Sequence, residues 1–486
     1  MSQRITIDPI TRLEGHGKIE IFLDDQGDVD RAILQIPELR GFEQFAVGRP
    51  AEEMPRITPR ICGVCPTAHH MASTKACDAV WHVTPPPAGR MIRELIYNTF
   101  QFEDHTLHFF FLGGPDFVVG PTAPKAERNI LGVIGKVGLE IGGQVIKIRR
   151  QAREIINHLG GKIIHPVCGL PGGVSKGLTE EKRQEFLVVA KECVEFAQFA
   201  LKIFDDVVLK NKEYVDIVVG PAYQLVTNYM GTVTDDNKVD FYDGDVRVVD
   251  TEGKDFSRFK AADYLDHIAE HVESWSYIKF PFLKKIGWKG FKEGKDTSIY
   301  RVAPLARLNA SDGMRTPLAQ EHYEKMFATL GGKPSHHTLA FHWARLIEAL
   351  QATELMVELL SNKDICDPNI RTIPTATPDE GVGIVEAPRG TLIHHYKTDK
   401  NGIIEEANLI VATIHNAPAI NMSIEKAAKA FIKGGKVDDG LLNLAEMAFR
   451  PYDPCHACGT HCLPGDMPLE VNIYDRDGDL VKQLKR

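Results

Sequence analysis

Apolar residues recur at helical spacing over long stretches in the interior of the chain. In the first stretch, Ile92, Leu95 and Ile96 fall on one face of a helix. Thr179 stands where a helix N-cap is expected, and Gly160-Gly161 is typical of a helix end. The pattern predicts helices over Pro87–Leu112, Pro124–Leu159, Glu180–Val208, His336–Leu360 and Ile424–Ile432.

The two ends of the chain show the pattern of β-strands instead. Three apolar runs at the N-terminus, separated by turn residues, predict a small antiparallel meander over Ile5–Ile7, Ile19–Leu23 and Ala32–Ile36. At the C-terminus, Leu469–Tyr474 and Leu480-Val481 flank the turn residues Asp477-Gly478, as in a hairpin. Between about Tyr214 and Pro334 the pattern breaks into short strands and turns. We therefore predict a mainly α fold with small peripheral β-sheets (α+β).

Composition narrows the class of protein. A length of 486 residues allows about three domains, but no linker is visible, so we predict one continuous domain. The net charge of −9 argues against a protein that coats nucleic acid. No apolar run is long enough to span a membrane. The N-terminus lacks the apolar region of a signal peptide, which favours a cytoplasmic location, although a chain can also be exported on a partner's signal.

Four of the nine cysteines form two CxxC pairs near opposite ends of the chain. Each pair is followed by a histidine: Cys62, Cys65 and His69 in one, and Cys455, Cys458 and His461 in the other. Four converging thiolates bind a soft metal, so the candidates are structural zinc, an iron–sulfur cluster or nickel. The distance between the pairs and the extra histidines argue against a closed zinc module. Two separate redox-active CxxC motifs are a further interpretation, which the absence of a βαβ context disfavours.

The sequence resembles the large, catalytic subunit of nickel–iron hydrogenases, which is a helical bundle. Besides both cysteine motifs, matching segments are ordered along almost the whole chain. They are Arg12-Leu13-Glu14-Gly15-His16, Arg40-Gly41-Phe42-Glu43, Asp104-His105-Thr106-Leu107-His108-Phe109 and Glu386-Ala387-Pro388-Arg389-Gly390. Asp8-Pro9-Ile10-Thr11 and Gly15-His16-Gly17-Lys18 look most like the soluble cytoplasmic branch. That branch serves nicotinamide-linked, coenzyme-linked or heterodisulfide-reducing complexes.

The resemblance implies reversible heterolytic cleavage of dihydrogen to protons and electrons at a nickel–iron centre. Cys62 and Cys455 match terminal nickel ligands, and Cys65 and Cys458 match the thiolates that bridge nickel to iron. The iron of this family carries carbon monoxide and cyanide ligands. Glu14 matches the carboxylate that takes the proton, with Cys455 as its first acceptor; a lone glutamate is otherwise most often a surface residue.

Further residues match the surroundings of that centre. Arg389 matches a fixed positive charge over the open nickel–iron edge, and Pro388 encloses the iron ligands; alone, they suggest a surface turn. Asp104 and Asp453 match carboxylates that orient the arginine. His69 matches a histidine that hydrogen-bonds the bridging sulfur.

The resemblance also implies a second metal, magnesium or alternatively iron. Glu43, His461 and a backbone carbonyl near Leu409 match its ligands, and magnesium commonly keeps several waters as well. A peptidase of this family commonly removes the segment after the last motif histidine. This makes residues 1–461 the hydrogenase domain and residues 462–486 an extension that is either cleaved or retained.

Partners follow from the cysteines that remain. Cys77, Cys168, Cys193 and Cys366 have no motif partners, so the chain cannot build its own electron relay. The expected partners are an iron–sulfur small subunit, further electron-transfer subunits of flavin, nicotinamide or heterodisulfide-reductase type, a maturation peptidase and nickel-insertion chaperones. Two other classes stay open: a quinone-reductase-type relative from a respiratory complex, which lacks the four cysteines, and a zinc-stapled structural subunit.

Overall fold

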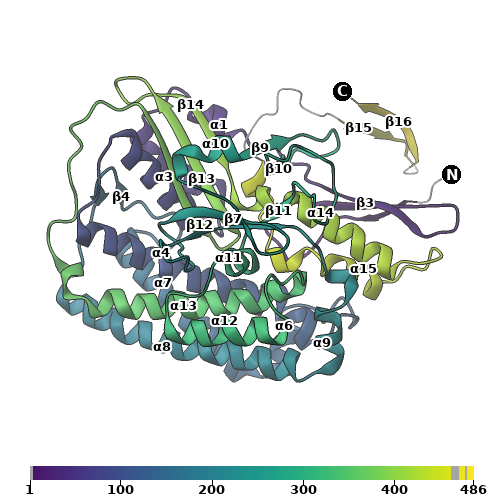
Figure 1. Cartoon of the computed structure of the whole chain (residues 1–486). Coiled ribbons are helices and arrows are strands. Elements are labelled where there is room, and N and C mark those ends of the chain that lie inside the picture. The colour runs from purple at the N-terminus through teal and green to yellow at the C-terminus, as the bar shows by residue number, and fades with distance from the viewer. Residues whose placement is uncertain (1–3, 461–469, 477–478, 486) are drawn as a thin grey trace.

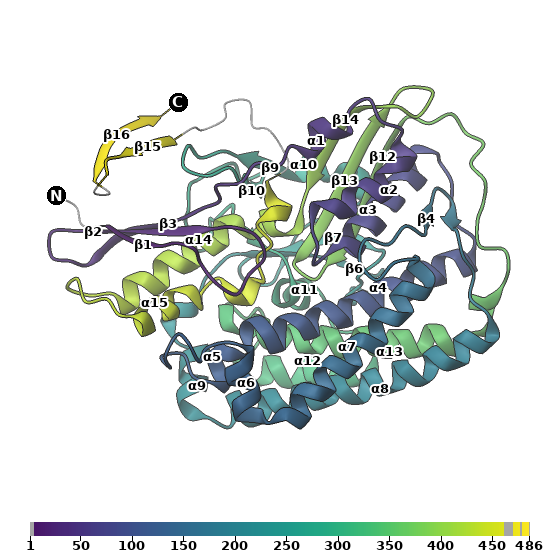
Figure 2. The ribbon, with the colours of Figure 1, turned by 180° about the vertical axis from the view of Figure 1, so that it is seen from behind.

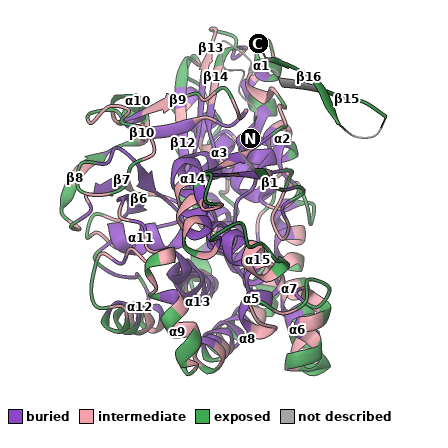
Figure 3. Cartoon of the chain, turned by 90° about the vertical axis from the view of Figure 1, so that its right-hand side faces the viewer, coloured by how far each residue is buried: buried purple, intermediate pink, exposed green. Residues whose placement is uncertain are grey.

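Four long helices pack together as a bundle, which forms the helical layer of the molecule. In the computed structural model, which describes residues 4–460, 470–476 and 479–485, they are α4 (Pro87–Leu107), α7 (Leu139–Gly160), α8 (Glu180–Phe204) and α13 (Phe341–Ser361). They lie side by side (Figure 1), and α13 packs against both α4 and α8. Helix α13 is buried around most of its circumference, because other helices pack on it from several sides. Figure 3 shows this burial. The mainly helical prediction is confirmed.

Most predicted helix boundaries agree with the structure, with two clear errors. The helix predicted over Ile424–Ile432 spans Ala412–Phe431. The side chain of Thr179 accepts a hydrogen bond from the Lys182 amide and caps α8, as predicted. The single helix predicted over Pro124–Leu159 is wrong: α6 (Ile130–Val137) and α7 are separate helices. The chain turns at Gly138, whose φ of 94° is open to glycine and strained for other residues. Apolar periodicity continues across that turn, so it could not reveal the break.

Small sheets complete the fold. The predicted N-terminal meander is present as β1 (Arg4–Ile7), β2 (Lys18–Leu23) and β3 (Val29–Gln35), paired in that order. A second antiparallel sheet consists of β12 (Glu380–Ala387), β13 (Gly390–Thr398) and β14 (Ile404–Ile410). A four-stranded sheet has the order β11 (Tyr300–Arg301), β6 (Asn228–Val233), β7 (Asp245–Val249) and β8 (Asp255–Phe259).

The region between Tyr214 and Pro334 is more helical than its pattern predicted. It holds α11 (Pro304–Ala310) and α12 (Pro317–Thr329) as well as short strands. Proline at the first position starts each of these helices. The remaining short elements are α1 (Phe42–Ala46), α2 (Met54–Ile57), α5 (Pro115–Val118), α9 (Lys212–Val218), α10 (Tyr264–His267), α15 (Asp439–Glu446), β4 (Gly169–Leu170), β5 (Gly173–Val174), β9 (Ile268–His271) and β10 (Phe280–Leu283).

Two helices and the second sheet surround the centre of the molecule. Helix α3 (Pro66–Val80) packs on β12 and β13, and α14 (Ala412–Phe431) packs on β3 and β10. Seen from behind in Figure 2, α3 lies against this sheet above the layer of long helices. The predicted C-terminal hairpin is also present, as β15 (Glu470–Tyr474) and β16 (Leu480–Lys485), which lie apart from the helical layer in Figure 1.

Candidate metal centre

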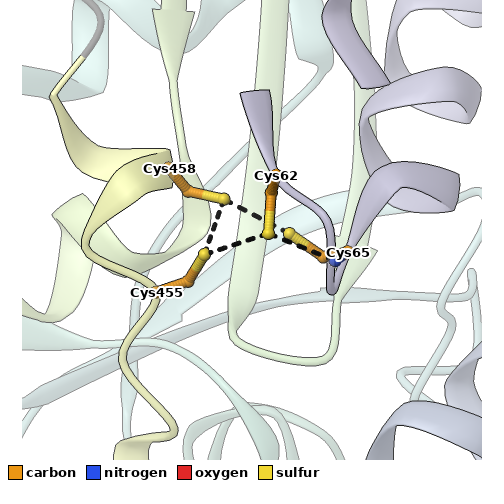
Figure 4. Close-up of side chains that lie close together, drawn as sticks. All are labelled: Cys62, Cys65, Cys455 and Cys458. Atoms are coloured by element: carbon orange, nitrogen blue, oxygen red, sulfur yellow. Dashed lines mark hydrogen bonds between the residues drawn. The ribbon is translucent and has the colours of Figure 1, made fainter. Parts of the chain in front are cut away.

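The two CxxC pairs meet in the interior of the protein. Cys62 ends a short 3-10 turn, Thr58–Ile61, and Cys65 precedes the first residue of α3. The other pair follows the 3-10 turn Arg450–Tyr452 near the end of the described body. Figure 4 shows the four side chains pointing at one another. Their sulfur atoms all lie within 4.8 Å of one another, and all four residues are buried.

The spacing of the sulfurs suits a single metal site. Cys62 Sγ lies 3.3 Å from Cys455 Sγ, Cys65 Sγ lies 3.3 Å from Cys458 Sγ, and Cys455 Sγ lies 2.8 Å from Cys458 Sγ. Metal–thiolate bonds of about 2.3 Å hold ligand sulfurs no more than roughly 4.6 Å apart. Within the described parts of the chain, no other group of three or more His, Cys, Asp or Glu residues is arranged to hold a metal.

A glycine outside the CxxC pairs allows Glu14 to reach them. Gly15 has a φ of 83°, and a Cβ there would lie 2.7 Å from the Ala457 amide nitrogen. With this close approach, Glu14 forms a parallel β-bridge with Cys455. By contrast, a Cβ on Gly63 would meet nothing within 4 Å, so the first CxxC pair does not need a glycine for space.

Glu14 presents its carboxylate to a candidate ligand. Cys455 Sγ lies 2.9 Å from Glu14 Oε2, and the Ala457 amide donates to the same oxygen at 3.2 Å. The backbone carbonyl of Glu14 accepts the His456 amide at 2.9 Å, which fixes the position of the residue. Burial raises the pKa of the Glu14 carboxyl above its ordinary value. Glu14 is therefore within proton-transfer reach of one thiol, as the resemblance implied.

Pro388 and Arg389 occupy the two-residue turn between β12 and β13, where Ala387 pairs with Gly390. The turn is buried, unlike the surface turn that these residues suggest when taken alone. Arg389 Nη1 donates to Asp104 Oδ2 at 3.0 Å, and Nη2 lies 2.9 Å from Asp453 Oδ2. Two carboxylates thus hold one buried guanidinium in place, so the predicted grouping of Arg389, Asp104 and Asp453 is present.

A small cavity adjoins the sulfurs. Its wall combines thiols, one guanidinium and apolar side chains, and every lining residue is buried: Cys65, Ala68, His69, Ala387, Arg389, Leu392, Val411, Ala412, Thr413, Cys455 and Cys458. Because polar atoms buried without partners are costly, those on the wall indicate a missing ligand. Among the described residues, His69 Nε2 and Arg389 Nε are such atoms. The residues therefore fit a metal group with small attached ligands.

His69 faces this cavity from α3. Its Nδ1 lies 3.1 Å from His394 Nε2, and its side chain is fully buried. Burial lowers the pKa of His69 to about 4, so the ring is neutral at pH 7. Its unpartnered Nε2 is the atom available to a group in the cavity.

Two of the three residues predicted for a second metal lie together. Glu43, in α1, accepts a hydrogen bond from the Leu409 amide at 2.8 Å, and Leu409 belongs to the edge strand β14. We expected a carbonyl from Leu409, whereas this hydrogen bond uses its amide. In an antiparallel strand the two groups of one residue face the same side, so the carbonyl is on the Glu43 side as well. Burial raises the pKa of Glu43 to about 7. His461 lies outside the described residues.

The structure adds Arg345, which the sequence motifs did not single out. This buried residue of α13 donates to the carbonyls of Pro388 at 3.2 Å and Pro451 at 3.1 Å. It also lies 3.1 Å from His105 Nδ1 and 3.4 Å from Asp453 Oδ2. Arg345 therefore connects the Arg389 turn with the segment that leads to Cys455. Arg345 is the one arginine of α13, and this was the only signal of its role in the sequence.

The fold and the site together define a metalloprotein with a buried centre of four thiolates in a largely helical chain. In the described part of the chain, no helix is long and apolar enough to cross a bilayer. Comparison with known families gives the particular class. A model described as nickel-dependent hydrogenase matches residues 40–130 and 232–461, and one described as HoxL-like matches residues 4–39.

Known hydrogenases are similar to this chain over nearly its full length. The chain is 52% identical to an iron-sulfur subunit of the F420-non-reducing hydrogenase from Archaeoglobus profundus, over 99% of each chain. It is 38% identical to the beta subunit of the NAD-reducing hydrogenase HoxS from Cupriavidus necator, over 100% of each. A solved NAD+-reducing [NiFe]-hydrogenase in the H2-reduced state covers 94% of this chain and 99% of its own, with a TM-score of 0.89 and 38% identity. This protein therefore belongs to the nickel-dependent hydrogenase family, as a large subunit. The family model and the relatives named above are all hydrogenases, which favours the hydrogenase interpretation over the zinc-stapled and quinone-reductase alternatives.

Proposed function

We propose that this hydrogenase large chain delivers the proton from dihydrogen to Glu14 and its electrons to an iron–sulfur partner. The observation that carries the proposal is the 2.9 Å distance between Cys455 Sγ and Glu14 Oε2 beside the four converging sulfurs. When bound, a nickel–iron centre supplies the place where dihydrogen is polarised and its electrons are accepted. The Cys455 sulfur then holds the proton at hydrogen-bond distance from the carboxylate oxygen that receives it.

The four thiolates divide into two pairs in this proposal. Cys62 and Cys455 would hold nickel alone, whereas Cys65 and Cys458 would hold both nickel and an iron that carries carbon monoxide and cyanide. Cys65, Cys455 and Cys458 line the cavity and Cys62 does not, so the cavity sets Cys62 apart, and the assignment of Cys455 rests on the family resemblance. The apolar side chains of Ala387, Leu392 and Val411 on its wall suit small, poorly hydrated ligands.

Arg389 provides fixed positive charge beside the reacting atoms. It stays protonated at any working pH, and its two carboxylate partners, Asp104 and Asp453, hold the guanidinium against the cavity wall. Pro388 sets the backbone of the turn that carries it. The arrangement orients charge before dihydrogen arrives, so no reorganisation is needed during the reaction.

A second metal site supports the C-terminal segment in this proposal. Glu43 and the Leu409 carbonyl supply hard oxygen ligands, which suit magnesium, and His461 completes the protein ligands, which also suits iron. Glu43 and Leu409 are already held together in the structure. The site would tie α1 and β14 to the end of the hydrogenase domain.

Electrons leave through other proteins of the complex. No second cysteine cluster exists within the described residues, so the chain offers no relay of its own. By analogy with its relatives, we propose an iron–sulfur small subunit, together with further partners that reduce an acceptor other than coenzyme F420 or that reduce a nicotinamide, in the cytoplasm.

Maturation completes the proposal. Chaperones insert nickel, and a peptidase then cuts after His461, which ends the hydrogenase domain and releases residues 462–486. Intact mass spectrometry of the purified protein tests this step. A species ending at His461 supports cleavage, whereas only the full-length mass shows that the tail is retained.

Metal content and isotope exchange of the purified complex test the catalytic proposal. We expect nickel and iron in each large subunit, little zinc, and exchange between deuterium gas and water. Zinc in place of nickel, or no exchange in a nickel-loaded sample, would overturn it.

A further inference from the structure

Two arginines from opposite ends of the chain share the same two buried acceptors. Arg12 Nη2 donates to Asp116 Oδ1 at 2.5 Å and to Asn443 Oδ1 at 3.0 Å. Arg450 Nη1 donates to both carboxylate oxygens of Asp116 at 3.1 Å and to Asn443 Oδ1 at 2.7 Å. Three of the four residues are buried, and the side chain of Arg12 is only 11% exposed. We call these four residues the arginine clasp.

Two short helices present the acceptors of the arginine clasp. Asp116 is the second residue of α5, and Asn443 lies on α15. Asn443 Nδ2 donates to Asp116 Oδ1 at 3.0 Å, so the amide also fixes the carboxylate. Glu446 lies three residues further along α15 on the same face, where it accepts hydrogen bonds from Arg450 and, at 3.3 Å, from Thr11 Oγ1. Two carboxylates thus balance two guanidinium groups, as buried charges require.

Each arginine belongs to a segment that carries one end of the proposed proton transfer. Arg12 lies two residues before Glu14, and Arg450 lies five residues before Cys455. The arginine clasp therefore joins the carboxylate segment to the thiolate segment, although none of its four residues lines the cavity. This link comes in addition to the two backbone hydrogen bonds that Glu14 forms with the segment around Cys455.

The Cys455 segment has anchors that do not depend on the arginine clasp. The Cys455 amide donates to Thr413 Oγ1 at 3.0 Å. Two residues earlier, Asp453 pairs with both Arg345 and Arg389. Loss of the clasp should therefore leave the thiolate, and with it the metal site, in place.

The Glu14 segment depends more strongly on the arginine clasp. Arg12 has a φ of 60°, a left-handed conformation that is uncommon for a residue with a side chain and persists only where contacts enforce it. Its guanidinium supplies three such contacts, to Asp116, to Asn443 and, at 3.1 Å, to the carbonyl of Leu112. Without them, the backbone at Arg12 can return to ordinary angles and carry Glu14 away from its sulfur partner.

We propose that Asp116 and Asn443 are positioning residues for proton transfer, which act through Arg12 to hold the Glu14 carboxylate at the Cys455 sulfur. The inference rests on the proposed function, in which Glu14 receives the proton. Proton transfer needs heavy atoms about 2.6–3.2 Å apart, and the 2.9 Å between Cys455 Sγ and Glu14 Oε2 meets that requirement. A displacement of about 1 Å would lower the rate roughly 100-fold.

The main test is Arg12→Met in the nickel-loaded complex. Methionine removes the donors of Arg12 and leaves Asp116 paired with Arg450, so no buried carboxylate loses its last partner. We expect exchange between deuterium gas and water to fall about 10- to 100-fold, with nickel content and infrared bands as in the wild type. Exchange at the wild-type rate, or a loss that only follows the loss of nickel, overturns the inference.

A double variant shows whether Arg12 acts through Glu14. Once Glu14→Gln has removed the group that Arg12 positions, adding Arg12→Met should lower the remaining exchange no further. A further fall at equal nickel content would place the effect elsewhere and overturn the inference.

Asn443→Ala tests the arginine clasp from the acceptor side. It removes the amide that both arginines share and keeps both carboxylates, so it also serves if Arg12→Met does not fold. We expect exchange to fall in the same direction, by less than in Arg12→Met. Exchange at the wild-type rate in a nickel-loaded Asn443→Ala complex would count against the clasp in the same way.

Arg128→Met is the matched control. Arg128 is also buried and also contacts α15, but it donates to the carbonyls of Ala123, at 2.7 Å, and Asp439, at 3.3 Å. We expect its exchange per nickel to equal that of the wild type. Equal losses in Arg128→Met and Arg12→Met would show a general effect of removing a buried arginine and overturn the inference. A wild type without nickel, or without exchange, would instead contradict the proposed function.

Discussion

The two cysteine pairs have different surroundings, although they complete one site. In the N-terminal arm, Thr58–Cys65, the Cys62 sulfur accepts backbone N–H groups from Val64 at 3.2 Å and Cys65 at 3.3 Å. In the C-terminal arm, Arg450–Thr460, the Cys455 sulfur faces the Glu14 carboxylate instead. Amide donors stabilise a thiolate, whereas a carboxylate exchanges a proton with its neighbour. In our proposal, the first arm therefore holds negative charge and the second passes on a proton.

Arg40 joins the two arms. Its backbone amide donates to the Thr460 carbonyl at 2.7 Å, and its guanidinium donates to the carbonyls of Arg60, at 3.3 Å, and Ile61. It thus contacts the residue before Cys62 and the end of the C-terminal arm. Two segments from opposite ends of the chain meet because a third segment binds both.

The largest expected effect is loss of the metal from either arm. We expect both Cys62→Ser and Cys455→Ser to reduce nickel to background, because a hydroxyl is a poor ligand for a soft metal. Cys193→Ala is the control, since Cys193 is buried in α8 away from the cluster. Elemental analysis of the purified variants checks this. Nickel retained in Cys455→Ser would show that the second arm is not a ligand.

Glu14→Gln should separate the proton function from metal binding. The amide cannot accept the proton, so we expect hydrogen–deuterium exchange to fall about 100- to 10,000-fold, while nickel content stays unchanged. Glu94→Gln is the control, because Glu94 pairs with Arg90 at a more exposed site at the start of α4. Exchange at the wild-type rate in Glu14→Gln would remove the proposed difference between the arms.

Much of this site could be predicted from the sequence because its chemistry lies in local motifs. The two CxxC pairs, Glu14 and Arg389 each stand in a short matching segment, and the structure brings all of them together. Arg345 and the link through Arg40 depend on tertiary contacts between distant segments, so no local pattern could reveal them. The break at Gly138 was missed for a related reason: apolar periodicity records burial and not the backbone angle of one glycine.

Arg345→Met should have a smaller effect than loss of Glu14. It removes the contacts to the Pro388 and Pro451 carbonyls and leaves Asp453 with only Arg389. Residues that orient a metal site typically contribute about 10- to 100-fold to activity, and we expect a loss in that range. Arg315→Met is the control, because Arg315 pairs with Asp240 at a partly exposed site. Equal activity of the two variants would show that Arg345 does not position the arms.

Thr179→Ala should have the smallest effect and should spare both arms. It removes the N-cap of α8, which typically costs about 1 kcal/mol of stability. We expect a lower melting temperature with unchanged nickel content and exchange rate. Altered exchange would mean that the helical layer transmits strain to the metal centre.

Above all, we propose that the two arms hold a nickel–iron centre with carbon monoxide and cyanide on the iron. Infrared spectroscopy of the purified, nickel-loaded complex detects the carbon monoxide and cyanide ligands directly. We expect bands from both ligands in the wild type and their loss in Cys65→Ser and Cys458→Ser. A fully matured, nickel-loaded protein without such bands would contradict the proposal.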